Sequence, residues 1–544
     1  MRKLLIVLAL LWPAAAPAPA GEMAPGSASL DPLPASEWTP ATAAHLLRRA
    51  GFGGTPAEIR RLHALGLDGA VDRLLDWEGP DSDVPSAGIT LTSRPGRAEM
   101  MGLADQEARK ALARQYRRQD RLQYLRIREW WMQMMVQTRH PLRERLVLFW
   151  HGHFTSGYRD VRNSYHMYMQ NTLFRRHAAG SFRALLHAIS KDPAMLEYLD
   201  NRSNRKQHPN ENYAREVMEL FTLGVGNYSE EDIREAARAL TGWTLVGNRF
   251  RLDERQHDTD AKSFLGRQGN FGGDEVLDII LEQPAAARHL ATRLFRYFAH
   301  GNPDQRLVDG LAQTLTRHDW ELRPALRRLF RSQAFYSANA TGTKIKSPVE
   351  FVVGLHRSLG MDGREVVGLS LQAQMLGQTL LDPPNVKGWP GGRGWITTSN
   401  LLNRYNIAGA IVGLPQDRAR AMRGQGQASR TMRMLERMRR VDPNGEEMEG
   451  MDRGKRRRGR RKAAPSASFD VLGEIRRLGL SSADEIVSYF GRALLANPMS
   501  AGMRTTLLAY LVRDGGFRLE SADARERLHG LLRLIVSTPE FQLT

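Results

Sequence analysis

The chain of 544 residues contains no cysteine. It therefore forms no disulfide and no thiolate metal site, and a hydrophobic core must stabilise its folded state. A chain of this length is ample for one or more such cores. Catalysis by a cysteine nucleophile is excluded as well, and no serine or threonine triad is evident.

Long apolar runs are also absent, apart from one short run at the N-terminus. Residues 1–3 carry two basic side chains, residues 4–12 are apolar, and residues 13–20 are small and Pro-rich. This three-part order is typical of a secretory signal peptide that is cleaved after Ala20. The run is too short to cross a bilayer, which needs about 20 apolar residues. We therefore expect a signal peptide at 1–20 and export to the periplasm or the exterior, with no nucleic-acid partner.

The net charge of +19 is unevenly distributed. Residues 417–462 contain 16 Arg or Lys and 7 Asp or Glu, so they contribute +9. Because such a segment buries too little apolar surface to fold, residues 413–468 are predicted to be a disordered basic insertion of low complexity. The basic run at 453–462 suggests binding to an anionic envelope polymer or lipid. A solvated linker is the alternative interpretation.

Helical periodicity dominates the rest of the chain. The predicted fold class is mainly α, a multi-helical globular array with one small β-hairpin at 244–265 and long irregular loops. Helices are expected to begin at Thr39-Pro40 and Thr55-Pro56, because threonine caps a helix and proline suits its first position. The predicted organisation is a flexible lead-in at 21–38, a helical core domain at 39–412, and a C-terminal helical unit at 469–544 that packs on the core.

Two histidines stand close together in Phe-Trp-His-Gly-His-Phe, at the end of a predicted helix. If Gly152 bends the chain, His151 and His153 approach one point. Histidine is the commonest metal ligand and the side chain best suited to acid–base work near neutral pH.

The predicted helix at 211–223 carries Glu211, Arg215 and Glu219 on one stripe, with Glu216 beside it. One interpretation is a solvent-exposed face with salt bridges. The other is a centre for a divalent transition metal, because imidazole and carboxylate together suit such ions. The predicted metal ligands are His151, His153, Glu211, Glu219 and His257, and the catalytic candidates are Glu216 and Asp258.

Residues 382–395 contain three prolines and four glycines and are predicted to form a compact, irregular loop. Its polar and aromatic side chains suggest a surface that binds a sugar or a peptide. The alternative is a structural loop whose tryptophans fill the core. The candidate binding residues are Asn385, Lys387, Trp389, Arg393 and Trp395.

No glycine-rich phosphate loop, Gly-x-Ser-x-Gly elbow or His-Glu-x-x-His run is present. Five segments, in order, resemble the bacterial family known as domain of unknown function 1800. The segments are 45–53, 149–154, 210–224, 235–243 and 383–390. The resemblance runs from about residue 40 to 412 and resumes in the C-terminal unit, whereas the basic insertion lies outside the family pattern.

This resemblance implies an exported, helical protein and no known reaction. It also implies a co-exported partner that resembles the sulfatase-like family known as domain of unknown function 1501, whose genes often lie beside those of the first family. Two functional hypotheses follow. One is an envelope or extracellular protein that acts with such a partner, and the other is a metal-dependent hydrolase with a His/Glu site.

Overall fold

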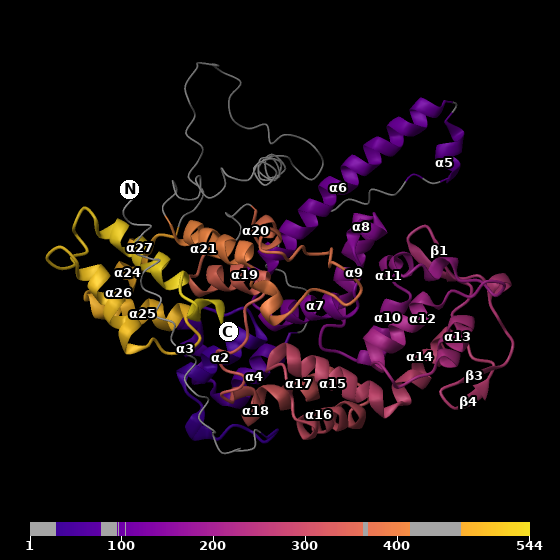
Figure 1. Ribbon diagram of the computed structural model, residues 1–544, viewed down its shortest axis with the longest axis horizontal. Helices are drawn as coiled ribbons and strands as arrows, with labels where there is room; N and C mark the ends of the chain where they lie inside the picture. The colour runs from indigo at the N-terminus through magenta and orange to yellow at the C-terminus, as the bar shows by residue number, and fades with distance from the viewer. Residues whose placement is uncertain (1–28, 78–94, 96, 104, 363–367, 414–468) are drawn as a thin grey trace.

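The computed structural model describes residues 29–77, 95, 97–103, 105–362, 368–413 and 469–544 (Figure 1). Within these ranges the chain is mainly helical, as predicted, with two small antiparallel sheets. None of the helices described there is long and apolar enough to cross a membrane. The predicted signal peptide and nearly all of the predicted basic insertion lie outside the described residues.

The first two helices begin where the sequence predicts. α2 (Pro40–Ala50) and α3 (Pro56–Ala64) each start with a proline, and the threonine before each accepts a hydrogen bond from the third residue of the helix. These caps satisfy amide groups that have no partner inside the helix. α4 (Gly66–Leu75) follows directly.

Residues 29–38, the described part of the lead-in predicted at 21–38, are held by contacts with the folded body. Leu33 is buried, and its amide donates to the carbonyl of Arg331 at 2.7 Å. A short 3-10 helix (Ala35–Glu37) then leads to Trp38, whose indole donates to the carbonyl of His63. These contacts are made with residues distant in the sequence, so composition alone did not reveal them.

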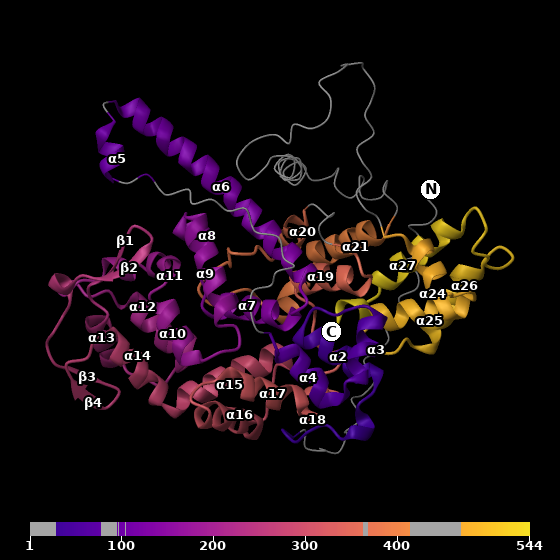
Figure 2. The same ribbon diagram turned by 180° about the vertical axis from the view of Figure 1, so that it is seen from behind.

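α7 (Pro141–His153) lies at the centre of the molecule, in contact with α2, α4, α6 and α9 (Figure 1). Almost every residue of α7 is buried, including charged ones. A helix that is surrounded on all sides shows no polar face in its sequence. α6 (Gln106–Gln137) packs its second half on α9, α19 and α20, while its first half projects from the body (Figures 1 and 2).

The predicted single hairpin at 244–265 is two hairpins. β1 (Trp243–Val246) pairs with β2 (Arg249–Leu252), and β3 (Lys262–Phe264) pairs with β4 (Arg267–Gly269). The second turn, Leu265-Gly266, has positive φ at both residues. Tight hairpin turns favour such a conformation because its twist matches that of the strands.

The remaining helices up to residue 412 follow in chain order as two groups, before and after the start of α15. The first group is α5 (Arg97–Gly102), α8 (Tyr158–Val161), α9 (Ser164–Arg176), α10 (Phe182–Ser190), α11 (Pro193–Tyr198), α12 (Glu211–Glu216), the π-helix η3 (Val217–Thr222), α13 (Glu230–Ala239) and α14 (Gly273–Glu282), with 3-10 turns at Asn201–Ser203 and Glu254–Gln256. The second group is α15 (Pro284–Phe298), α16 (Gln305–Arg317), α17 (Leu322–Arg331), α18 (Gln333–Tyr336), α19 (Pro348–Ser358), α20 (Leu369–Met375), η6 (Gly392–Trp395) and α21 (Thr398–Val412).

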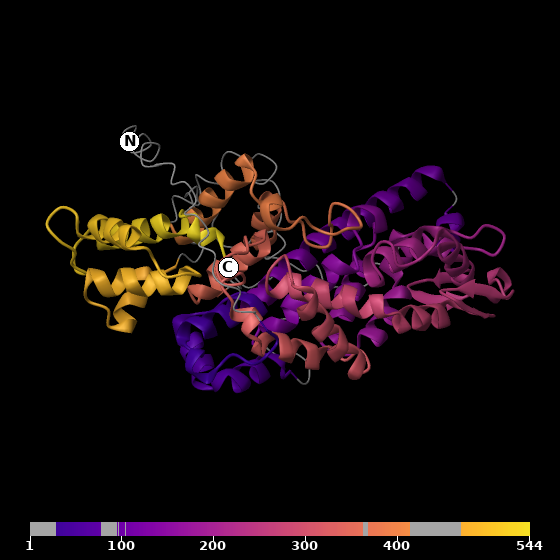
Figure 3. The ribbon, with the colours of Figure 1, turned by 60° about the horizontal axis from the view of Figure 1, so that its bottom comes forward.

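The C-terminal helices lie at the end of the molecule opposite the hairpins (Figure 3). They are α24 (Val471–Leu478), α25 (Ala483–Leu494), α26 (Ala501–Val512) and α27 (Ala524–Val536), followed by η7 (Glu540–Gln542). α27 packs on α21, and α25 packs on α19. The last residues then return to the centre, where Leu543 pairs with Ile345 in an antiparallel bridge. This pairing holds residues 344–346 in place beside α7 and α15.

Candidate functional site

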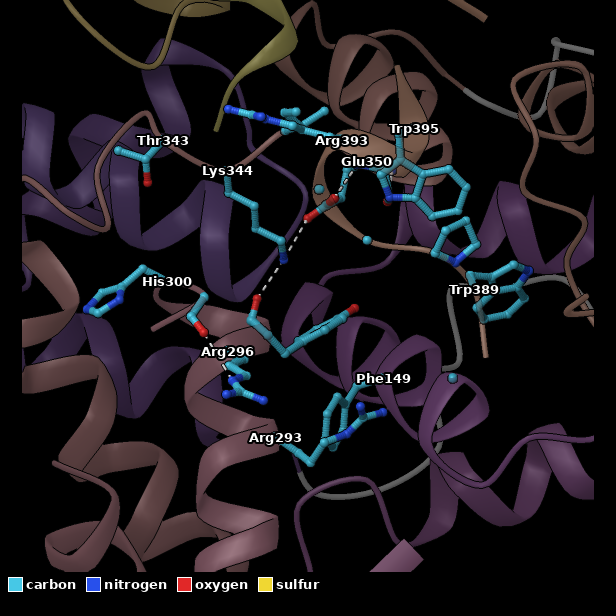
Figure 4. Close-up of a pocket in the computed structure, with 18 of the residues that line it drawn as sticks. Phe149, Arg293, Arg296, His300, Thr343, Lys344, Glu350, Trp389, Arg393 and Trp395 are labelled. Atoms are coloured by element: carbon cyan, nitrogen blue, oxygen red, sulfur yellow. Dashed lines mark hydrogen bonds and ion pairs between the residues drawn. The ribbon is translucent and has the colours of Figure 1, made fainter. Parts of the chain in front are cut away.

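An open cleft of about 810 Å³ lies between α7, α15, the segment before α19 and the loop before α21 (Figure 4). Its size is within the range of small-ligand pockets, about 300–1,000 Å³. Cationic and aromatic side chains line it. The cations are Arg293, Arg296, Lys344, Lys387 and Arg393, and the aromatic residues are Phe149, Tyr297, Trp389 and Trp395.

In the described part of the chain, four of these cations have no carboxylate within ion-pair distance, although the charge of Lys387 acts on the nearby Glu216. Among the described residues, Arg293, Arg296, Lys387 and Arg393 form no ion pair. The Arg296 guanidinium donates instead to the carbonyl of Gly301 at 3.0 Å. Burial and the neighbouring Arg296 lower the pKa of Arg293. The cleft therefore presents an excess of positive charge that an anion would relieve.

The only carboxylate among the described residues that line the cleft is Glu350, at its inner end. Glu350 forms a buried ion pair with Arg145 and accepts from the amide of Ser347 at 2.6 Å. Burial alone would raise the pKa of Glu350, but Arg145 and Lys344 together hold it well below its ordinary value. Glu350 therefore stays ionised, and its charge is shared between Arg145 behind the cleft wall and Lys344 in the cleft lining.

The loop before α21 reaches the cleft through a close contact with α7. Gly388 has a φ of +89°, and a Cβ added there would lie 2.5 Å from the carbonyl oxygen of Gly152. The adjoining Trp389 ring lies tilted against His151, with 5.4 Å between ring centroids, and its indole donates to the carbonyl of Thr379 at 3.2 Å. The histidine segment at 149–154 and the irregular loop at 382–395, both noted in the sequence, thus meet at one wall of the cleft.

Replacing Gly388 by alanine is expected to move this loop away from α7. The substitution combines a positive φ with a backbone clash, so we expect a loss of about 1–3 kcal/mol in unfolding free energy. Urea unfolding measures it. Gly391→Ala is the control, because a Cβ at Gly391 meets nothing within 4 Å. Equal stability of the two variants would contradict the assigned role of Gly388.

The loop residues predicted as a binding surface are largely brought together. Lys387, Trp389, Arg393 and Trp395 line the cleft. Trp395 is also buried, so it contributes to the core at the same time. Asn385 does not line the cleft, because its side chain accepts from the amide of Lys387 at 2.9 Å and stabilises the turn.

Sequence analysis missed Arg293, Arg296 and Lys344. The first two lie three residues apart on α15, so they occupy one helix face and could have been paired by their spacing. Lys344 comes from a short segment with no motif, and only the fold places it near the others.

The two histidines predicted as metal ligands do not approach one point. α7 stays helical through His153, and residues two apart on a helix point about 200° from each other. His151 lies against the rings of Trp131 and Phe174, whereas His153 Nε2 donates to the carbonyl of Phe221 at 2.9 Å. Gly152 does not bend the chain but provides room for Trp389.

The predicted carboxylates are held by other partners. Glu211 pairs with Arg215, which also pairs with Glu230, and Glu219 accepts from the hydroxyl of Tyr228. These contacts match the salt-bridged interpretation of this helix. Glu216 is half-buried, and burial and the neighbouring Glu219 raise its pKa.

The last two candidates lie beside the hairpins. The ring of His257 contacts the carbonyl of Thr241 at 2.8 Å, and Asp258 forms an ion pair with Arg238 at 2.8 Å. Among the described residues, no group of three or more His, Asp or Glu side chains is placed to hold a metal ion. The residues present therefore do not fit the predicted transition-metal centre, and no chemical step is derived through a metal.

Buried histidines make the protein sensitive to acid. Burial lowers the pKa of His151 to about 3, whereas the unfolded chain titrates near 6.5. The unfolded state therefore takes up protons first, and stability is lost as the pH falls below 6.5. Between pH 7.5 and pH 5, His151 alone is expected to cost about 2 kcal/mol of unfolding free energy.

Urea unfolding at both pH values tests this prediction. His151→Leu should reduce the loss between pH 7.5 and pH 5, while exposed His208→Leu should leave it unchanged. An identical pH dependence in the wild type and His151→Leu would show that His151 is not buried in its neutral form.

Comparison with known families gives one match. A family model described as "Protein of unknown function (DUF1800)" matches residues 45–543, which is nearly the whole chain. The match includes the C-terminal helices and confirms the resemblance seen in the sequence motifs. No curated protein and no solved structure matches the chain.

Proposed function

Because the chain belongs to the DUF1800 family, which is described only as of unknown function, we propose a function from its own site. The protein is an exported envelope or extracellular protein that binds an anionic polymer in the cleft. The observation that supports this proposal is the convergence of four cations, which form no ion pair with any described residue, on a cleft lined by aromatic rings.

The chemistry of the cleft favours a ligand with several charges. Arginine guanidinium groups bind sulfate, phosphate and carboxylate oxygens through paired hydrogen bonds. The partly buried indole of Trp389 provides flat apolar surface beside the cations. One small anion would neutralise only part of this charge, so a polymer with repeated anionic groups fits the lining better.

A second cationic surface supports an anionic ligand. On the projecting half of α6, Lys110, Arg114, Arg117, Arg118 and Arg121 are exposed and share one helix face. Among the described residues, Arg117, Arg118 and Arg121 have no ion pair. A long polyanion could contact this face in addition to the cleft.

Export and partner remain part of this proposal. Export is inferred from the N-terminal pattern, and the co-exported partner that resembles the family known as domain of unknown function 1501 is inferred from the family resemblance. The basic run at 453–462 lies outside the described residues and is proposed as a further contact with anionic polymer or lipid.

A polymer panel tests the binding proposal. We expect dextran sulfate, polyphosphate and polygalacturonate to bind the purified full chain, and neutral dextran of equal length to show no binding. Arg293→Ala/Arg393→Ala should weaken binding at least tenfold. The control variant is Arg306→Ala/Arg525→Ala. It removes two arginines whose side chains are more exposed than the side chain of Arg293. Equal binding of neutral dextran would refute the proposal.

A further inference from the structure

The inner end of the cleft holds several cations around one carboxylate. Lys344 lies between α15 and α19, where its ammonium donates to the carbonyl of Tyr297 at 2.6 Å and lies 3.6 Å from Glu350 (Figure 4). Behind it, Arg145 of α7 pairs with the same Glu350. Arg49 of α2 donates to the carbonyl of Phe298 at 2.8 Å. Glu350 therefore contacts two cations directly, Arg145 and Lys344, and the third cation, Arg49, lies close to it.

The groups around Lys344 come from every element packed against it, and Thr544 pairs with Lys344 through the backbone while its oxygen accepts from Arg49 at 3.5 Å. α2 supplies Arg49, α7 supplies Arg145, and α19 supplies Glu350. α15 supplies the Tyr297 ring, which lies 4.7 Å from the ammonium, and His300 follows α15 in the cleft lining. Burial and Arg49 lower the pKa of His300, so this ring is neutral near pH 7 and adds no further positive charge.

Lys344 differs from Arg49 and Arg145 because it is open to the cleft. Its side chain is 22% exposed, against 1% for Arg145, and it lines the cavity. Burial, Arg49 and Arg145 lower the pKa of Lys344 to about 7, although Glu350 opposes them. In a cluster with surplus cations, the group that can release a proton to solvent relieves the repulsion.

We propose that the inner end of the cleft is a proton-linked anion site, in which a sulfate, phosphate or carboxylate group binds beside Lys344 together with one proton taken up by this lysine. The proposal rests on the proposed function and deepens it. A bound anion adds the negative charge that the cluster lacks, so it favours the ammonium form of Lys344. By linkage, protonation of Lys344 favours anion binding to the same extent.

The sign of the pH dependence follows directly. Well below pH 7, Lys344 is already charged, so binding takes up no proton and the affinity is independent of pH. Above pH 7, the free protein carries a neutral amine, and binding must restore the proton. The affinity therefore falls as the pH rises, by up to tenfold per pH unit.

Calorimetry with sulfate ligands tests the site, because their charge does not change between pH 6 and pH 9. A short dextran sulfate is titrated into the full chain at pH 8 in two buffers of different ionisation enthalpy, and again at pH 6. Inorganic sulfate alone is the second arm, which separates a free anion from a polymer-borne group. On binding at pH 8, we expect each protein molecule to take up more than half a proton. At pH 6 we expect almost no proton uptake.

Lys344→Arg keeps the positive charge but cannot release a proton at these pH values. We expect it to bind at pH 8 without proton uptake and to retain at pH 9 its affinity at pH 6. Uptake that persists in a folded Lys344→Arg, or that is lost in His300→Gln instead, would overturn the site. If Lys344→Arg does not fold, the wild type and His300→Gln decide: uptake at pH 8 that survives His300→Gln supports Lys344.

The two proposals fail in different ways. Absence of any binding to dextran sulfate would remove the proposed function itself. Binding with no proton uptake at pH 8 would leave the anionic cleft standing and overturn only the proton linkage.

Discussion

Replacing Arg293, Arg296, Lys387 and Arg393 together by alanine is expected to lower the affinity for dextran sulfate at least 100-fold. Each hydrogen bond to a charged group contributes about 1.5–3 kcal/mol. A 100-fold loss is about 2.7 kcal/mol, so partial loss of the four contacts suffices. Equilibrium titration at a fixed, moderate salt concentration measures the change, because polyanion binding depends strongly on salt.

The fold should tolerate this variant, since none of the four side chains has an ion-pair partner among the described residues. Removing them reduces repulsion between neighbouring cations, as in the pair Arg293 and Arg296. We therefore expect unchanged or slightly higher stability in urea. A matched variant with Arg117, Arg118 and Arg121 replaced by alanine removes the α6 stripe and should lose much less affinity. The reverse ranking would place the main binding surface on α6.

Replacing Glu350 by glutamine is expected to have the largest effect on stability. Glu350 is buried and compensates Arg145, which is itself almost fully buried. Breaking a buried ion pair leaves an uncompensated charge and costs about 3–5 kcal/mol. We expect a loss of this size in the free energy of unfolding, measured by urea denaturation at pH 7.

Two variants support the interpretation of this result. Glu526→Gln replaces an exposed glutamate on α27 and should change stability by less than about 0.5 kcal/mol. The double variant Glu350→Gln/Arg145→Met removes both members of the ion pair. It should recover part of the lost unfolding free energy, because the charge of Arg145 is no longer left buried without its partner. A change below about 1 kcal/mol for Glu350→Gln would show that the cluster is hydrated and not buried.

Local chemistry made much of the fold predictable from the sequence. Thr39-Pro40 and Thr55-Pro56 marked two helix starts correctly, because a cap and its proline act within one turn. The hairpin region was recognised, but its division into two hairpins was not. The second turn, Leu265-Gly266, places a leucine at positive φ, a position that this residue type seldom adopts.

The candidate site could be predicted only in part, because some of its residues come from segments that are far apart in the sequence. Trp389 and Arg393 stood out because they share one irregular loop, whereas Lys344 joins them only through packing of distant segments. The metal-ligand prediction for His151 and His153 depended on a bend at Gly152. The surrounding core keeps α7 helical there, and the two rings point into different parts of it.

Arginine footprinting by mass spectrometry tests the central claim most directly. The full chain is treated with an arginine-modifying reagent, with and without bound dextran sulfate, and the modified sites are quantified. We predict protection of Arg296 and Arg393 in the cleft, with no protection of exposed Arg306. Bound polymer that protects only the α6 stripe or the run at 453–462, and leaves Arg296 and Arg393 reactive, would contradict the assignment of the cleft as the anion-binding site.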